Sequence, residues 1–377
     1  MPGNNQAARA AVDDAVVTGL GQAVCIFGAL VFSIFVPRVL GAAMYGEWML
    51  YRGMAIFWLP LMVLGDREVM AAFYVPFYEK GEDRQAGLLF KSLMVLRLFL
   101  LPLVLGGGLL LLFTSSSLFR TPQAAFCLMV TLVAKTGQYM LQTLLFGRRR
   151  MGYMAFLEGI QTILLPLFVL LAYRRVGAVG IPWAAAMADL LLFGVALVLT
   201  PRKAVWTSGW PALLDVRHMF RYAFVVALAG NIIMSLNNLL YYLMNIWGYA
   251  PDVIGRVGLV MRCAGVAQTG LMAIATALMP ALMSIHQQHG RDKMFQWQDV
   301  VSRFGLALIL LLAGNIRLFG PWAVRWVWGP EFADVSPLLF GGLMAVAPVW
   351  LGAQWSRQFL LERRSQVYLI SSLIYGG

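Results

Sequence analysis

The chain alternates between long apolar stretches and short polar segments. Most apolar stretches hold roughly 20 residues or more, the length of a helix that crosses the hydrocarbon core of a bilayer. Unpaired backbone polar groups cannot face lipid, so the pattern predicts an all-α polytopic membrane protein. The expected helices are residues 16–36, 48–64, 86–113, 124–146, 151–173, 176–200, 222–247, 257–285, 300–319 and 336–355, with an eleventh beginning near Ser365.

Composition excludes a soluble protein. Of the 377 residues, 60% are hydrophobic and only 12% are charged, against about 25% charged in a typical soluble domain. The net charge of +12 comes from basic residues scattered through short loops, so we expect membrane lipid and no nucleic acid as a partner. The three cysteines lie apart in apolar stretches, and we find no motif for a metal, a cofactor or a catalytic nucleophile. The chain is therefore not expected to be an enzyme.

Basic residues also predict the orientation. Loops that face the cytoplasm are enriched in lysine and arginine. With a cytoplasmic N-terminus, the larger share of the loop cations falls on the inside, including Arg148–Arg150, Arg202 and Lys293. We therefore expect a multi-pass protein of the cell (inner) membrane whose N-terminus is cytoplasmic.

An internal repeat runs through the sequence. Gly46 and Gly255 lie 209 positions apart, and so do Gly81 and Gly290 in later loops. An even number of helices per repeat brings both halves in from the same side, as in parallel repeats. We predict an N-terminal six-helix lobe over 1–200, a cytoplasmic amphipathic linker over 201–221 and a C-terminal lobe over 222–377. By the repeat length, this second lobe is incomplete after about eleven helices.

Ionisable residues inside spanning helices mark a cavity or pathway by default, because each costs about 2.5–3.5 kcal/mol on insertion scales. Cations outnumber anions among them, and Arg52 and Arg262 are nearly repeat-equivalent. Two alternatives stay open: Arg52 and Arg97 can snorkel to the headgroups, and Lys135 can form a structural pair with Asp189 or Glu158. The residues are Arg52, Arg97, Lys135, Glu158, Asp189 and Arg262.

Uncharged polar residues form two stripes at helical spacing. They line a central cavity between the halves or, alternatively, hold helices together. The cavity hypothesis takes Gln138, Gln142, Asn231, Ser235 and Asn238 as substrate-facing. The stripes are Thr131, Lys135, Gln138 and Gln142 in one helix, and Asn231, Ser235, Asn238, Tyr242 and Asn245 in another.

Several short motifs resemble one family. Segments 36–46 and 78–83, and in the second half 277–280 and 328–333, are similar to the polysaccharide-transporter branch of the multidrug/oligosaccharidyl-lipid/polysaccharide (MOP) superfamily. The resemblance implies a MATE-like architecture of two six-helix lobes. It also implies flipping of undecaprenyl-diphosphate-linked oligosaccharides for O-antigen, capsule or exopolysaccharide synthesis, with a polysaccharide polymerase and chain-length machinery as possible partners.

The residues favour this function over two alternatives. A cavity holding Arg52, Lys135 and Arg262 would attract a diphosphate in a medium of low dielectric constant, and Glu158 or Asp189 could couple an ion gradient. A drug or cation antiporter of the same superfamily would favour an acidic cavity. A membrane glycosyl polymerase or ligase would need a catalytic outer loop, and the outer loops here are short.

Overall fold

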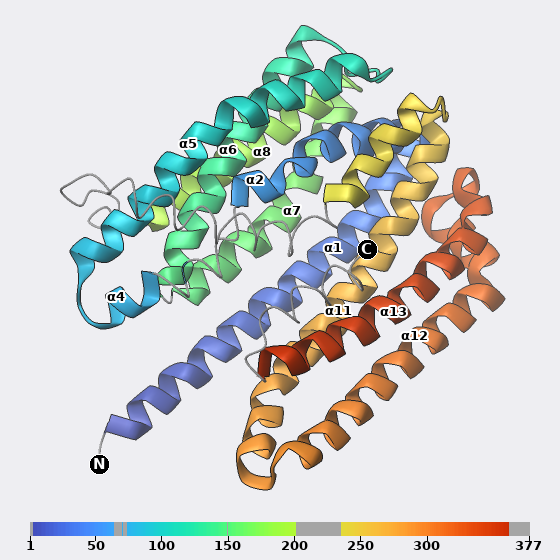
Figure 1. Ribbon diagram of the computed structural model, residues 1–377. Coiled ribbons are helices and arrows are strands. Elements are labelled where there is room, and N and C mark those ends of the chain that lie inside the picture. Colours follow the sequence, from blue (N-terminus) through green and yellow to red (C-terminus); the bar gives the residue numbers. More distant parts are fainter. Residues whose placement is uncertain (1–2, 64–69, 71–73, 149, 201–234, 362–377) are drawn as a thin grey trace. The chain divides into compact units, whose positions relative to one another are not determined.

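The computed structural model describes residues 3–63, 70, 74–148, 150–200 and 235–361. Within these residues the secondary structure is helical (Figure 1). Seven helices are long and apolar enough to cross a membrane. Large apolar side chains such as Phe99 and Val198 lie exposed on their surfaces, as expected where lipid rather than water covers the helix. The predicted linker 201–221 and the eleventh helix from Ser365 onward lie outside the described residues.

The first two predicted helices are joined in one long element. Helix α1 runs from Gly3 to Phe57 and is broken inside by Gly41, whose φ of 73° and ψ of 168° are not helical. Only glycine adopts this backbone conformation without strain. The sequence predicts a loop between these two helices, whereas in the structure the single residue Gly41 interrupts the helix. The short helix α2, Leu59–Val63, follows.

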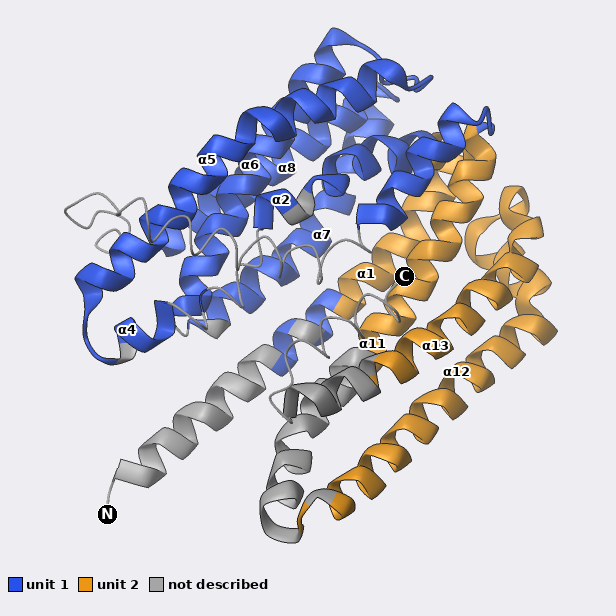
Figure 2. Ribbon diagram, in the orientation of Figure 1, with its two compact units in different colours: residues 1–25, 47–250 blue, residues 26–46, 251–377 orange. Residues whose placement is uncertain are grey.

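Contacts group the described chain into two compact units, shown in Figure 2. Unit 1 comprises residues 1–25 and 47–250, and unit 2 comprises 26–46 and 251–377, so α1 contributes to both. The six-helix lobes over 1–200 and 222–377 stay a prediction, since much of the connection between them is not described.

Among the described residues, unit 1 holds four long helices, two parts of α1 and several shorter helical segments. Residues 235–246 are helical. Helix α6 begins where proline occupies its first turn and Thr121 accepts a hydrogen bond from the Ala124 N–H at 3.2 Å, a favoured N-terminal cap. It is the most buried of the seven candidate spans. The elements are α4 (Val75–Glu79), α5 (Asp83–Thr114), α6 (Pro122–Gly147), α7 (Met151–Val176) and α8 (Gly180–Leu199).

An aromatic cluster holds α4 against the ends of α5 and α6. The Arg148 guanidinium donates to the Tyr74 hydroxyl at 3.1 Å, lies 5.4 Å from the centre of the Tyr78 ring, and approaches Asp83 at 3.9 Å. Burial raises the pKa of the Tyr74 phenol, and the hydrogen bond from Arg148 partly opposes this. Arg148 thus acts as a packing residue at this helix end. The side of the membrane on which it lies stays a prediction.

Unit 2 holds helices α11 (Pro251–His289), α12 (Arg291–Trp328) and α13 (Ser336–Leu361), with the 3₁₀ helix η2 (Pro330–Val335) before the last. The sequence predicted residues 300–319 for the span that α12 contains, but α12 has 38 residues. The added turns carry exposed Lys293 and Asp299 at one end and exposed Trp322 and Trp326 at the other. A helix continues past the hydrocarbon core when its side chains suit the interface, and hydropathy alone does not detect these turns.

Candidate functional site

The α6 stripe lies inside unit 1. All four side chains of the stripe are less than 10% exposed: Thr131, Lys135, Gln138 and Gln142. They share one face of α6, and neighbouring helices cover this face. Helix α7 contributes Gln161 and helix α8 contributes Asp189 to this group. We call the six residues the α6 polar core: Thr131, Lys135, Gln138, Gln142, Gln161 and Asp189.

An ion pair lies at the centre of the α6 polar core. The Lys135 Nζ is 2.9 Å from the Asp189 Oδ1, and the two side chains are 6% and 2% exposed. The structure therefore adopts the alternative in which Lys135 pairs with Asp189. A partner of opposite charge reduces the cost of burying either group in an apolar surrounding. Whether the pair also takes part in transport stays a proposal.

Several polar atoms of the α6 polar core have no hydrogen-bond partner among the described residues. The Gln138 Nε2 donates to the Gln161 Oε1 at 3.1 Å. The Gln138 Oε1, the Gln142 Nε2 and the Thr131 Oγ1 are buried and unmatched. Buried polar atoms are usually satisfied, so these three are exceptions within the described part of unit 1. Gln161 was not selected from the sequence, although it lies three residues after Glu158 and so shares its side of α7.

In the second stripe, three of the described residues form hydrogen bonds to other segments of the chain. Ser235 donates to the Phe57 carbonyl at 2.8 Å, and Tyr242 is 2.7 Å from the Thr114 hydroxyl. Asn245 accepts from the Ser116 N–H at 2.8 Å. Asn238 is half-buried, and Asn231 lies outside the described residues. For these three hydrogen-bonded residues, the geometry matches the alternative of polar contacts that join helices.

The predicted membrane cations differ in environment. Arg97 is 2% exposed and donates to the Val63 carbonyl at 3.1 Å, so it is buried in unit 1 rather than snorkelling. Arg52 is half-buried, with its guanidinium 5.7 Å from the centre of the Trp48 ring. In unit 2, Arg262 is half-buried as well.

Arg262 stacks on an aromatic ring. Its guanidinium carbon is 4.7 Å from the centre of the Phe32 ring, a favourable cation–π distance. Its Nε is buried without a hydrogen-bond partner among the described residues, where we also find no carboxylate that pairs with it. Glu158, the other predicted coupling residue, is half-buried on α7.

Two of the motifs that carry the family resemblance meet in unit 2. The Glu331 carboxylate accepts a hydrogen bond from the Ala42 N–H at 2.9 Å, directly after the break at Gly41. The Trp328 indole donates to the Ser33 carbonyl at 2.6 Å. Free N–H groups at a helix start attract a carboxylate. Glu331 therefore caps the part of α1 that begins at Ala42, a role that the sequence spacing alone did not reveal.

The repeat-equivalent glycines also meet. A Cβ atom on Gly46 would overlap the Pro251 carbonyl oxygen, and one on Gly255 would overlap the Ala42 carbonyl oxygen. The contacts are reciprocal, since Ala42 and Pro251 are separated by the same 209 positions as the two glycines. Small residues four apart allow such close approach of helix backbones.

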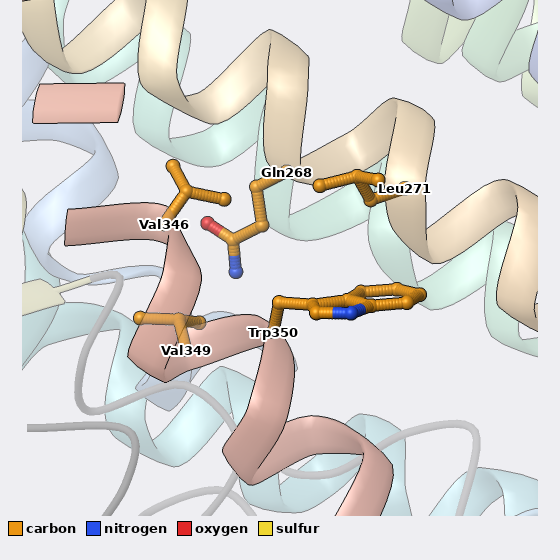
Figure 3. A pocket seen from close by; sticks show the side chains of 5 residues that line it. All are labelled: Gln268, Leu271, Val346, Val349 and Trp350. Atoms are coloured by element: carbon orange, nitrogen blue, oxygen red, sulfur yellow. The ribbon is translucent and has the colours of Figure 1, made fainter. Parts of the chain in front are cut away.

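A small recess lies between α11 and α13, shown in Figure 3 with Gln268 facing Val346 and Trp350. The recess is too narrow to admit a water molecule. The Trp350 indole donates to the Ser302 carbonyl at 3.1 Å, which fixes one wall. The recess is therefore a packing feature and not a ligand site.

Comparison with known proteins identifies the fold. No protein-family model matches the sequence, and no curated protein matches it as a relative. Among solved structures, an inward-facing multidrug resistance MATE family transporter of the MOP superfamily is similar at a TM-score of 0.66 and 13% identity, covering 93% of this chain and 88% of the other. An outward-facing structure of such a transporter is similar at 0.55 and 14%, covering 96% and 84%. The chain is thus an all-α polytopic membrane protein with a MATE-like fold.

Proposed function

We propose that the chain is a transporter that moves an anionic, lipid-linked oligosaccharide across the cell membrane by alternating access. The observation that carries the proposal is Arg262: a cation in a predicted spanning helix, stacked on Phe32 at 4.7 Å and without a carboxylate partner among the described residues. A stacked guanidinium still presents N–H groups at its edge, and these suit the oxygens of a diphosphate. Arg52 offers a second stacked guanidinium at a nearly repeat-equivalent position.

The fold supports transport as the class of activity. Structures similar to this chain are described as inward-facing and outward-facing transporters, and alternating access requires two such states. The reciprocal contact of Gly46 with Pro251 and of Gly255 with Ala42 supports the predicted repeat. Undecaprenyl-diphosphate-linked sugars are the substrate that the family resemblance implies.

The α6 polar core is the proposed coupling site. The Lys135–Asp189 pair can exchange a proton or accept a cation at Asp189 when Lys135 moves away, and the unmatched Gln138 and Thr131 oxygens lie in the same group. Intramembrane ionisable residues of this kind serve as relays in transporters. Glu158 is the second candidate for this role.

A fluorescent polyprenyl-diphosphate disaccharide in proteoliposomes tests the substrate. We expect the protein to translocate it, and Arg262→Gln to slow the initial rate about tenfold, as expected for one lost charge-assisted contact. Arg262→Lys keeps part of the rate because it keeps the charge. Arg303→Gln is the control, since Arg303 is an exposed cation paired with Asp299. Equal rates for wild type and Arg262→Gln would refute the proposed role of Arg262.

A second function has specific support. Two similar structures are described as multidrug resistance transporters, and Asp189 is a buried carboxylate that an antiporter could use. In the same vesicles, we expect no uptake of a lipophilic cationic dye under an imposed pH or sodium gradient. Uptake of the dye without movement of the disaccharide lipid would establish the antiporter instead.

A further inference from the structure

An open groove runs between the end of α7 and the start of α8. Its volume is about 440 Å³, and α7 residues from Phe168 to Val176 and α8 residues from Gly180 to Met187 line it. Nine residues of helix correspond to a length of about 12 Å along the axis. The side chains that form its walls are apolar apart from Arg175 at the helix end.

The groove exists because its floor is made of small residues. A Cβ atom on Gly180 would lie 2.9 Å from the Ala172 carbonyl oxygen, so the two helix ends are already in close contact. Larger side chains stand on either side and remain exposed: Leu171 by 53%, Trp183 by 44% and Met187 by 52%. The result is a furrow with an apolar floor on a face where large apolar side chains lie exposed.

Arg175 makes one end of the furrow cationic. Both Arg174 and Arg175 are exposed in the last turn of α7, and neither forms an ion pair with a described carboxylate. Candidate spans end at Val176 and begin again at Gly180, so this end lies at the membrane boundary. Trp183, in the first turn of α8, belongs to the residue type that concentrates at that depth. An acyl chain along the furrow would bring a phospholipid phosphate to the guanidinium.

We propose that this α7–α8 groove binds one anionic phospholipid, with an acyl chain on the Ala172–Gly180 floor and its phosphate headgroup at Arg175. Charge and shape both select this occupant: the furrow is narrow and apolar, and its polar end carries a cation without a protein partner in the described chain. The site is independent of the proposed transport activity, since lipid retention is measured without any substrate.

Native mass spectrometry of the purified full chain, exchanged into micelles with phosphatidylglycerol or phosphatidylcholine, tests the headgroup. We expect wild type to retain phosphatidylglycerol about fivefold over phosphatidylcholine, the effect of roughly one membrane-surface charge. Arg175→Gln should abolish this preference. Arg174→Gln is the matched control, because it removes a charge from the same helix turn but not from the groove. An equal loss in both variants would overturn the proposal in favour of a diffuse surface charge.

A second pair of variants tests the acyl chain. Leu171→Trp fills the furrow while leaving Arg175 in place, and we expect it to reduce phosphatidylglycerol retention at least as strongly as Arg175→Gln. Leu190→Trp makes the same change at an exposed α8 position outside the groove and should leave retention unchanged. Unchanged retention in Leu171→Trp would show that no chain enters the furrow and would overturn the proposal.

The same purified proteins also test two other possible occupants of the groove, a polyprenyl phosphate and a second copy of the chain. Displacement of phosphatidylglycerol by an equimolar amount of a polyprenyl phosphate would assign the groove to an isoprenoid carrier and overturn the phospholipid. A dimer that Leu171→Trp dissociates, with no lipid retained by wild type, would assign it to a second copy of the chain. Retained phosphatidylglycerol in a monomeric wild type, with polyprenyl phosphate failing to compete, supports the proposal.

Discussion

Removing one partner of the Lys135–Asp189 pair should destabilise the protein far more than removing both. The pair is 2.9 Å apart and its side chains are 6% and 2% exposed. At this separation and an effective dielectric constant of about 20, the attraction is roughly 6 kcal/mol before desolvation is subtracted. Losing one partner leaves a buried charge uncompensated, which typically costs about 3–5 kcal/mol.

A double-mutant cycle measures this coupling. Lys135→Met and Asp189→Leu each remove one charge, and the double variant replaces the pair by apolar side chains. We expect each single variant to lose about 3–5 kcal/mol of unfolding free energy and the double variant to lose less than either, because no unpaired charge remains. The assay is unfolding by titration with sodium dodecyl sulfate, followed by circular dichroism.

The chain offers an exposed pair of the same kind as a control. Arg303 and Asp299 lie 2.7 Å apart at positions i and i+4 of α12, but their side chains are 79% and 55% exposed. Exposed pairs contribute about 0.2–1 kcal/mol, so the cycle on these residues should give little coupling. A Lys135→Met variant that loses less than about 1 kcal/mol, or a double variant as unstable as the sum of the singles, would refute the reasoning.

Two further predictions follow from close contacts. Gly46→Ala and Gly255→Ala should each lower the free energy of unfolding by about 1–3 kcal/mol, because the added Cβ overlaps a facing carbonyl oxygen. A Cβ on Gly106 meets nothing within 4 Å, so Gly106→Ala should be neutral or stabilising. Glu47→Ala should lower the free energy of unfolding by about 1–3 kcal/mol, because the Ser117 hydroxyl and the Leu118 N–H donate to this buried carboxylate at 2.7 and 3.0 Å. Glu47→Gln keeps an acceptor and should recover part of this loss. An equal loss of unfolding free energy in both variants would contradict the role of Glu47 as an acceptor.

The sequence predicts the helices well because the bilayer imposes one strong constraint. A spanning segment must be apolar for roughly 20 residues, and the spans within α5, α6, α7, α8 and α13 lie where hydropathy places them. The predicted helix boundaries are wrong where this constraint no longer applies. Gly41 changes the direction of α1 without a polar loop, and the outer turns of α12 are helical although they are amphipathic.

Site residues are harder to predict because a polar stripe has the same pattern whether it faces water or a neighbouring helix. The spacing of Ser235, Tyr242 and Asn245 places them on one face of a helix. Their hydrogen-bond partners Phe57, Thr114 and Ser116 lie over 100 residues away in the sequence. Likewise, the sequence alone predicts only that Lys135 and Asp189 are each costly in a membrane. Only the packing of α6 against α8 decides between the pair and the separate charges.

The Lys135–Asp189 pair also separates the four predicted membrane cations into two groups by their surroundings. With Lys135 neutralised by Asp189 and Arg97 buried against the Val63 carbonyl, two of the four predicted cations are used inside unit 1. The remaining two, Arg52 and Arg262, share a different surrounding, since each is half-buried and stacked on an aromatic ring. They are also nearly one repeat apart in the sequence. In the proposed function, each of these arginines is therefore a candidate to bind a phosphate group of the substrate. The proposed function therefore uses the two arginines for the substrate and the Lys135–Asp189 pair for coupling, and the transport rates of Arg262→Gln and Arg303→Gln test the first of these roles.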